Sequence, residues 1–159
     1  MRLRNGQAMV ETVVAVVLLT VVFFTLYDFS RRVAARTVLD YAAARAARAK
    51  AVGFNEFMCE KSARAAMIPV AGRRTWPADL NGADVVSRIP IYLSSANGAV
   101  ANGVLAYEYW PTTTIDVDSG GGIAATAEAK LEMRTDSFTA HGAAKVESHY
   151  PFYMWEQGR

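Results

Sequence analysis

The sequence predicts an α+β fold in which a long N-terminal helix precedes a small antiparallel β-sheet domain. Two observations lead to this prediction. No glycine or proline interrupts residues 7–52, where alanine, leucine, valine and arginine dominate. From residue 85 onward, short runs rich in β-branched and aromatic residues alternate with turn residues. The 159 residues of the chain are enough for one membrane helix and one small domain.

The first part of the helix is apolar enough to enter a membrane. No residue from Thr12 to Tyr27 is charged, and its few polar side chains are threonines. At about 1.5 Å per residue this run covers roughly 24 Å, and its apolar neighbours extend it toward the roughly 30 Å of a hydrocarbon core. A core helix of a soluble protein would show a polar stripe, which this run lacks. We therefore expect a transmembrane segment over residues 8–29.

A cleaved secretory signal peptide is the first alternative. Arg2 and Arg4 provide the basic start that such a signal needs. The small residues of a cleavage site are missing after the apolar run, because Tyr27 is followed by Asp28, Phe29, Ser30, Arg31 and Arg32. Basic residues on both sides of the run leave the orientation in the membrane undecided by charge alone.

The N-terminal residues "RNG", followed by "QAMVE" and the apolar helix, resemble the processing site of type IV prepilins and related pseudopilins. Together with the continuation "YAAARAARA", they are most similar to the TadE-like pseudopilins of tight-adherence (Tad) pili. The resemblance implies that a prepilin peptidase of the inner membrane cuts between Gly6 and Gln7. Residues 1–6 would then be the leader, and Glu11 would be the fifth residue of the mature chain.

The position of Glu11 has a physical explanation that does not depend on the family. Cleavage before Gln7 would create an α-amino group, with a reference pKa of about 7.7–8.0, one helical turn from this carboxylate. Opposite charges about 4 Å apart attract by roughly 4 kcal/mol at an effective dielectric constant near 20. The amine of a neighbouring subunit could therefore offset the cost of Glu11 in lipid, unless cyclisation of Gln7 removes its charge. The alternative is a glutamate that reaches the headgroups by snorkelling.

The second half of the helix is rich in small residues. They stand at positions 34, 35, 42, 43, 44, 46, 47 and 49. Such positions allow neighbouring helices to approach closely, although alanine is also simply a good helix former. We expect one continuous helix over residues 7–52, about 46 residues and roughly 70 Å long.

Residues 53–84 are expected to form a short helix and a linker. Gly53 suits the C-terminal cap of the long helix, and Asn55 suits the N-terminal cap of a helix through "EFMCEKSARAAM". Pro69 and Gly72 end that helix, and residues 69–84 read as a loop.

Residues 85–159 are expected to form a β-rich extracytoplasmic domain that rests on the outer helix. Residues 127–136 alternate small or apolar residues with charged ones, which indicates a half-exposed strand despite their helix propensity. The last strand is expected across the turn at residues 137–142. This last strand covers residues 144–154, and the other strands are expected at 85–93 with Pro90 at an edge or bulge, at 104–110 and at 112–118.

The residues do not form a recognisable catalytic or metal-binding pattern. Asp116, Asp118 and the glycines at 120–122 resemble a calcium loop, but the remaining EF-hand ligands are missing, so a hairpin turn is favoured. His141, His149 and Cys59, the single cysteine, lack the spacing of a metal site. We therefore expect no enzyme activity, no metal and no cofactor, and a thiol that reports membrane topology if it is exposed.

Charge and aromatic residues suggest contacts with proteins rather than with nucleic acid, because a net charge of +2 is small. Basic residues dominate positions 28–50 and acidic residues dominate positions 104–159. This asymmetry suits head-to-tail contact between copies or simply reflects solvated faces. The C-terminal aromatic residues suit either a docking patch or core packing; they are Tyr150, Phe152, Tyr153 and Trp155.

The resemblance implies a structural subunit, a minor pilin or pseudopilin that takes part in assembly or initiation of a Tad-type type IV pilus. Its expected partners are other pilin subunits, the prepilin peptidase, the inner-membrane assembly platform and membrane lipid. Its expected location is the bacterial inner membrane, as a single-pass protein with the C-terminal domain outside the cytoplasm. The alternative is an unprocessed single-pass membrane protein whose exposed domain binds a ligand or a protein partner.

Overall fold

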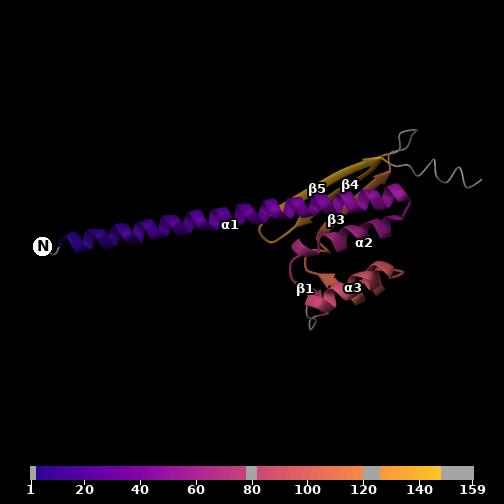
Figure 1. Ribbon diagram of the computed structural model, residues 1–159, viewed down its shortest axis with the longest axis horizontal. Coiled ribbons are helices and arrows are strands. Elements are labelled where there is room, and N and C mark those ends of the chain that lie inside the picture. The colour runs from indigo at the N-terminus through magenta and orange to yellow at the C-terminus, as the bar shows by residue number, and fades with distance from the viewer. Residues whose placement is uncertain (1–2, 78–81, 120–125, 148–159) are drawn as a thin grey trace, which may run out of the picture. The chain divides into compact units, whose positions relative to one another are not determined.

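The computed structural model describes residues 3–77, 82–119 and 126–147 of the chain (Figure 1). The chain divides into two compact units, Met1–Ala34 and Ala35–Arg159. Helices and strands are mixed, and a three-stranded antiparallel sheet follows the N-terminal helix. The predicted α+β class is therefore confirmed.

Helix α1 runs from Leu3 to Val52, so the predicted long N-terminal helix is confirmed. In the first unit its side chains are exposed wherever the structure describes them. The hydroxyl groups of Thr12, Thr20 and Thr25 each donate to the backbone carbonyl four residues earlier, at 2.8 Å. Because the threonines satisfy their own polar groups within the helix, the surface that remains is apolar.

The small residues in the second half of α1 have a role that the sequence did not reveal. Ala35, Ala42, Ala43, Ala46 and Ala47 are buried in the core of the second unit, together with Leu39. The neighbours that approach the helix at these five positions belong to the same chain, among them Cys59 and Ala63. They allow the chain's own elements to pack against the helix.

Both predicted helix caps in the next segment are confirmed. Helix α1 ends before Gly53, whose φ of 98° is left-handed and thus suits glycine. Helix α2 runs from Glu56 to Ala66, and the Asn55 side chain accepts a hydrogen bond of 2.9 Å from the Met58 N–H. A short 3₁₀ helix, η1, follows at Ile68–Val70.

The segment expected to be a loop contains a strand. Strand β1, Arg74–Trp76, pairs antiparallel with strand β2, Ala106–Tyr107. The strand predicted over residues 104–110 is thus reduced to two residues of a small separate sheet. Pairs this short have no alternation that a sequence pattern could reveal.

The strand predicted over residues 85–93 is wrong, because this segment is helix α3, Gly82–Ser94, with Pro90 inside it. Val85, Ile89 and Leu93, four residues apart, are partly buried and pack against the core, and Tyr92 is fully buried. Their helical spacing and burial outweigh the β-propensity of the residues and the cost of proline. Helix α4, Gly98–Val104, follows, and the Asn97 side chain caps it by accepting from the Val100 N–H at 2.9 Å.

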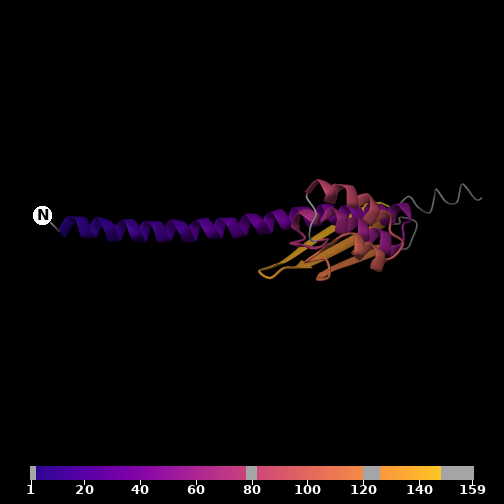
Figure 2. The same ribbon diagram turned by 90° about the horizontal axis from the view of Figure 1, so that it is seen from below.

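The main sheet has the order β3–β4–β5 and is antiparallel throughout. Its strands are β3 at Thr113–Ser119, β4 at Thr126–Arg134 and β5 at Thr139–Glu147. Strand β4 alternates between side chains facing the core and side chains facing solvent, so the predicted strand in this segment is confirmed. In Figures 1 and 2, the part of α1 that belongs to the second unit runs along one face of this sheet.

The last strand begins earlier than predicted. The Thr135 N–H donates to the Phe138 carbonyl at 2.9 Å, which closes a tight turn, and β5 starts at Thr139. The predicted turn over residues 137–142 is therefore wrong for most of its length. The rest of the predicted last strand, residues 148–154, lies outside the described residues, as do His149 and the C-terminal aromatic residues.

Candidate functional site

The residues predicted for processing lie at the start of α1. Gly6 and Gln7 belong to the first turns of the helix, which begins at Leu3. The first four N–H groups of a helix lack partners within it, so this end opens more easily than the helix interior. Gln7 and Glu11 are exposed and four residues apart, which places them on one face of the helix. An α-amino group on Gln7 would thus lie one turn from the Glu11 carboxylate.

Glu11 lies at the edge of an apolar surface. Among the residues whose side chains the structure describes, none forms an ion pair or a hydrogen bond with its carboxylate. An unpaired carboxylate is costly in lipid. The charge therefore needs water, headgroups or a cation from outside the described chain.

The apolar surface beyond Glu11 is large. From Met9 to Phe29 the large hydrophobic side chains are more than half exposed, for example Leu19 at 73% and Phe24 at 60%. Helix α1 is long and apolar enough to cross a membrane, and none of its most apolar stretch is buried inside the protein. Soluble monomers rarely expose so continuous an apolar surface, so a bilayer or other helices must cover it.

The C-terminal end of this surface has the residues of a membrane–water boundary. The Arg31 guanidinium lies 5.9 Å from the centre of the Tyr27 ring, close enough for a cation–π contact. Both side chains are exposed, and Arg32 follows them. Tyrosine and arginine at the end of an apolar run are typical of the headgroup region.

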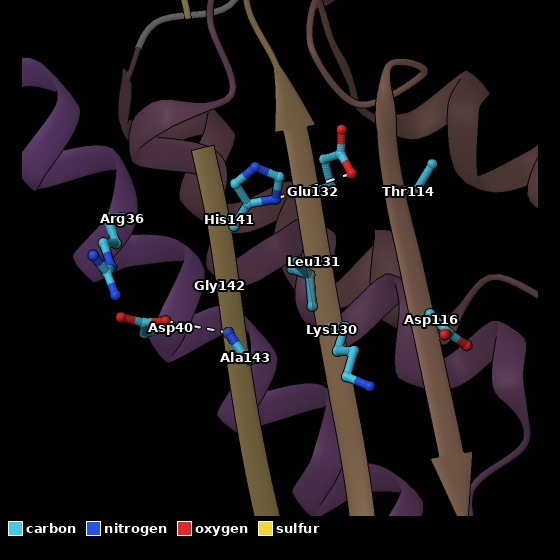
Figure 3. A pocket seen from close by; sticks show the side chains of 10 residues that line it. All are labelled: Arg36, Asp40, Thr114, Asp116, Lys130, Leu131, Glu132, His141, Gly142 and Ala143. Atoms are coloured by element: carbon cyan, nitrogen blue, oxygen red, sulfur yellow. Dashed lines mark hydrogen bonds and ion pairs between the residues drawn. The ribbon is translucent and has the colours of Figure 1, made fainter. Parts of the chain in front are cut away.

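The second unit has an open cavity of about 610 Å³ on the sheet (Figure 3). Its charged side chains come from α1, β3, β4 and β5 and are of both signs; they are Arg36, Asp40, Asp116, Lys130, Glu132 and His141. Figure 3 shows His141 and Glu132 facing each other, at 3.9 Å between Nδ1 and Oε2. Both are more than half exposed, so this pair contributes less than about 1 kcal/mol even when His141 is protonated.

Among the described residues that line the cavity, the only hydroxyl group belongs to Thr114, and no described hydrogen bond joins it to a general base. Among the described residues, no group of three or more His, Cys, Asp or Glu could hold a metal ion. Asp116 and Asp118 stand on the exposed face of β3, while the glycines at 120–122 lie outside the described residues.

Cys59 does not meet the condition for a topology reporter, because its thiol is not exposed in the folded protein. Its side chain is fully buried, with Sγ 3.7 Å from the Phe54 carbonyl oxygen. Burial raises the pKa of this thiol above its ordinary value, which further lowers its reactivity. A topology reporter must therefore be placed at another position.

Lys61 is a buried charged residue that sequence reasoning missed. Its Nζ donates to the carbonyl oxygens of Leu93 and Ser95, both at 2.6 Å, and lies 4.7 Å from the centre of the Phe57 ring. Burial lowers the pKa of Lys61, and the carbonyl oxygens oppose that effect by favouring the ammonium. A lysine inside "EKSAR" reads as a solvated helix charge, so the sequence had no signal for this contact.

The comparison with protein families concerns the N-terminal helix. Residues 6–48 match the family model described as TadE-like protein. No curated protein and no solved structure matches the chain. The match begins at Gly6, includes Glu11 and ends four residues before the end of α1. Over residues 6–48 the chain is therefore similar to the TadE-like family.

Proposed function

We propose that this chain is a minor pilin or pseudopilin that takes part in assembly or initiation of a Tad-type type IV pilus. A single observation supports this most strongly. The TadE-like segment, residues 6–48, contains the exposed apolar part of α1 and has Gly6 at its start. Glu11 follows five residues later and is unpaired among the side chains that the structure describes. The role is structural, and the chain has no catalytic activity of its own in this proposal.

The processing step follows from the same residues. A prepilin peptidase hydrolyses the peptide bond between Gly6 and Gln7 and releases residues 1–6. The new α-amino group lies one helical turn from Glu11 of its own chain and is also within reach of an adjoining subunit. When helices stack, the amine of one subunit pairs with the carboxylate of the next and sets their register.

The proposed location is the inner membrane, with α1 spanning it once over residues 8–29 and the sheet domain outside the cytoplasm. The exposed apolar surface from Met9 to Phe29 supports insertion. The assembly partners in this proposal are other pilin subunits, the prepilin peptidase and the inner-membrane assembly platform. Extraction of the helix into a bundle would replace lipid by other apolar helices.

Intact-mass measurement tests the processing step. The wild type and Gly6→Leu are each expressed with the cognate prepilin peptidase. The wild type should lose residues 1–6, whereas Gly6→Leu should keep them. Gly103→Leu is the matched control, because Gly103 is exposed and has open space where a side chain would stand. If the wild type keeps its leader, the chain acts as an unprocessed single-pass membrane protein instead.

Thiol labelling in intact cells tests the proposed topology. Cys59→Ala removes the buried thiol, and Ala96→Cys adds a thiol at an exposed position between α3 and α4. A membrane-impermeant reagent should label the double variant from outside the inner membrane. The Cys59→Ala single variant is the control for background labelling. Labelling that requires access from the cytoplasm would reverse the topology.

A further inference from the structure

The two edges of the main sheet can be compared residue by residue, because the direction of each backbone group is fixed by the pairing. In an antiparallel pair, opposing residues alternate between exchanging both hydrogen bonds and pointing both groups away. Three hydrogen bonds outside the ladder show which residues of each strand point toward the neighbouring strand and which point away, and the three agree with one another. They are Thr135 N–H to Phe138 O, Ala143 N–H to Asp40 Oδ1 and Thr113 N–H to Trp110 O.

The edge at β5 is occupied at its centre by the chain itself. The Ala143 N–H points away from β4 and donates to the Asp40 carboxylate at 3.2 Å. One position earlier, Gly142 lies so close to the backbone of Leu39 and Asp40 that a Cβ atom would not fit. Helix α1 therefore stands against the middle of β5, and another strand cannot extend the sheet there.

The edge at β3 is different. The even-numbered residues of β3 bond to β4, so the N–H and C=O groups of Ile115 and Val117 point outward. Thr113 is the first residue that points outward, and its N–H donates to the Trp110 carbonyl oxygen. Within the part of the chain that the structure describes, no residue bonds to the outward groups of Ile115 and Val117. Unpaired outward groups on an edge strand are a template for another strand.

The charges beside this edge disfavour a second β3 strand as the partner. Asp116 and Asp118 stand on the exposed face of β3, and Asp118 lies directly opposite Glu128 of β4. Like charges opposite each other destabilise a sheet. Glu128 already forms an ion pair of 3.5 Å with Lys130, so the positive charge of Lys130 is shared between Glu128 and the aspartates of β3. A second copy of β3 would add two more aspartates to this face.

We propose that the β3 edge accepts an extended segment of a partner protein that has lysine or arginine at alternate positions. The partner's backbone would bond to Ile115 and Val117, and its basic side chains would lie beside Asp116 and Asp118. The residues between them would be apolar and would cover the half-buried Ile115. This mode is strand addition, in which backbone bonds provide affinity and alternate side chains provide selectivity.

Amide hydrogen exchange on the full chain in detergent micelles tests the proposal. The probe is a short synthetic peptide that alternates lysine with valine. Without peptide, the amides of Ile115 and Val117 should exchange faster than that of Asp116, which bonds to β4. With saturating peptide, the exchange of Ile115 and Val117 should slow by about tenfold or more. No slowing would overturn the proposal.

Two control peptides separate strand addition from simple attraction. A peptide that alternates glutamate with valine should bind much more weakly because of Asp116 and Asp118. A lysine–valine peptide methylated on the backbone nitrogens that face β3 should leave Ile115 and Val117 unprotected. Equal protection by either control would overturn the proposal. Protection that appears without peptide and grows with protein concentration would identify a second copy as the occupant and would also overturn it.

A charge-matched pair of variants tests the role of the acidic face. Asp118→Lys and Glu147→Lys change the net charge equally, but Asp118 is on β3 and Glu147 is on β5. The affinity for the lysine–valine peptide should fall about tenfold in Asp118→Lys and stay unchanged in Glu147→Lys. Equal affinities would contradict the proposal, and far-UV circular dichroism checks that both variants fold. The outcome is independent of processing at Gly6, so this proposal and the proposed function can fail separately.

Discussion

The carboxylate of Asp40 accepts a hydrogen bond of 3.2 Å from the backbone N–H of Ala143, which joins two residues 103 positions apart in the chain. The bond connects α1 to the edge strand β5. It satisfies a backbone donor that would otherwise be left without a protein partner, and it fixes where the helix crosses the sheet. The helix thus anchors the domain that follows it.

Asp40→Ala should lower the free energy of unfolding of the second unit by about 1 kcal/mol, because it removes the acceptor for Ala143. Urea denaturation followed by circular dichroism measures this change. Asp40→Asn keeps an oxygen at the same place and should lose less. Equal losses in the two variants would show that the hydrogen bond does not stabilise the fold.

Gly142→Ala should destabilise the second unit by about 1–3 kcal/mol, because the new Cβ atom would overlap the backbone of α1. The Leu39 carbonyl oxygen is 2.6 Å and the Asp40 nitrogen 2.7 Å from the position of that atom. Gly103→Ala is the control, since a Cβ atom there meets nothing within 4 Å. Thermal unfolding compares the two, and similar melting temperatures would contradict the close approach.

Lys61→Met should destabilise the protein by about 2–4 kcal/mol, because the carbonyl oxygens of Leu93 and Ser95 lose their donor in a buried place. Lys130→Met is the control, since Lys130 is two-thirds exposed and should change stability little. Urea denaturation measures both. A stable Lys61→Met would mean that water replaces the ammonium.

Ionisation of the Tyr92 phenol should lower the free energy of unfolding at high pH. Burial raises the pKa of its phenol above 10.0, although the nearby Arg64 guanidinium acts in the opposite direction. The folded state therefore keeps the neutral phenol where the unfolded chain would ionise. This stability is fully present below pH 10 and is lost as the pH rises through the folded pKa.

Tyr92→Phe should remove this part of the pH dependence. The ring packs 5.0 Å from the Trp110 ring between centroids, and phenylalanine can keep that contact. Denaturation curves of both proteins between pH 8 and pH 12 test the expectation. Parallel losses of stability would assign the effect to another group.

Glu11→Ala should leave cleavage after Gly6 intact but reduce incorporation with partner subunits, because the paired charge is lost while the cleavage site is kept. Co-purification with co-expressed pilin-like subunits measures incorporation, and intact mass measures cleavage. Glu11→Asp keeps the charge and should recover part of the incorporation. Normal incorporation of Glu11→Ala would indicate that the carboxylate only meets headgroups.

Sequence patterns predicted the elements whose conformation depends only on residues close by in the chain. The cap residue Asn55 acts on the N–H of Met58, only three positions away, so the local sequence was sufficient to find it. The alternation along β4 was also visible in the sequence, because small or apolar residues on the buried face alternate with charged residues on the exposed face. The prediction failed for α3, where β-branched residues and Pro90 suggested a strand. There the packing of Val85, Ile89 and Leu93 decided the conformation.

The sequence by itself determined the long helix, its apolar surface and the positions of Gly6, Gln7 and Glu11, because helix propensity and hydrophobicity act within a few turns. Only the tertiary structure decided that Asp40 meets Ala143, that Lys61 binds the end of α3 and that no further strand pairs with β3 among the described residues. These contacts join residues far apart in the chain. Their partners are chosen by how the helix and the sheet pack, and no local pattern encodes that choice.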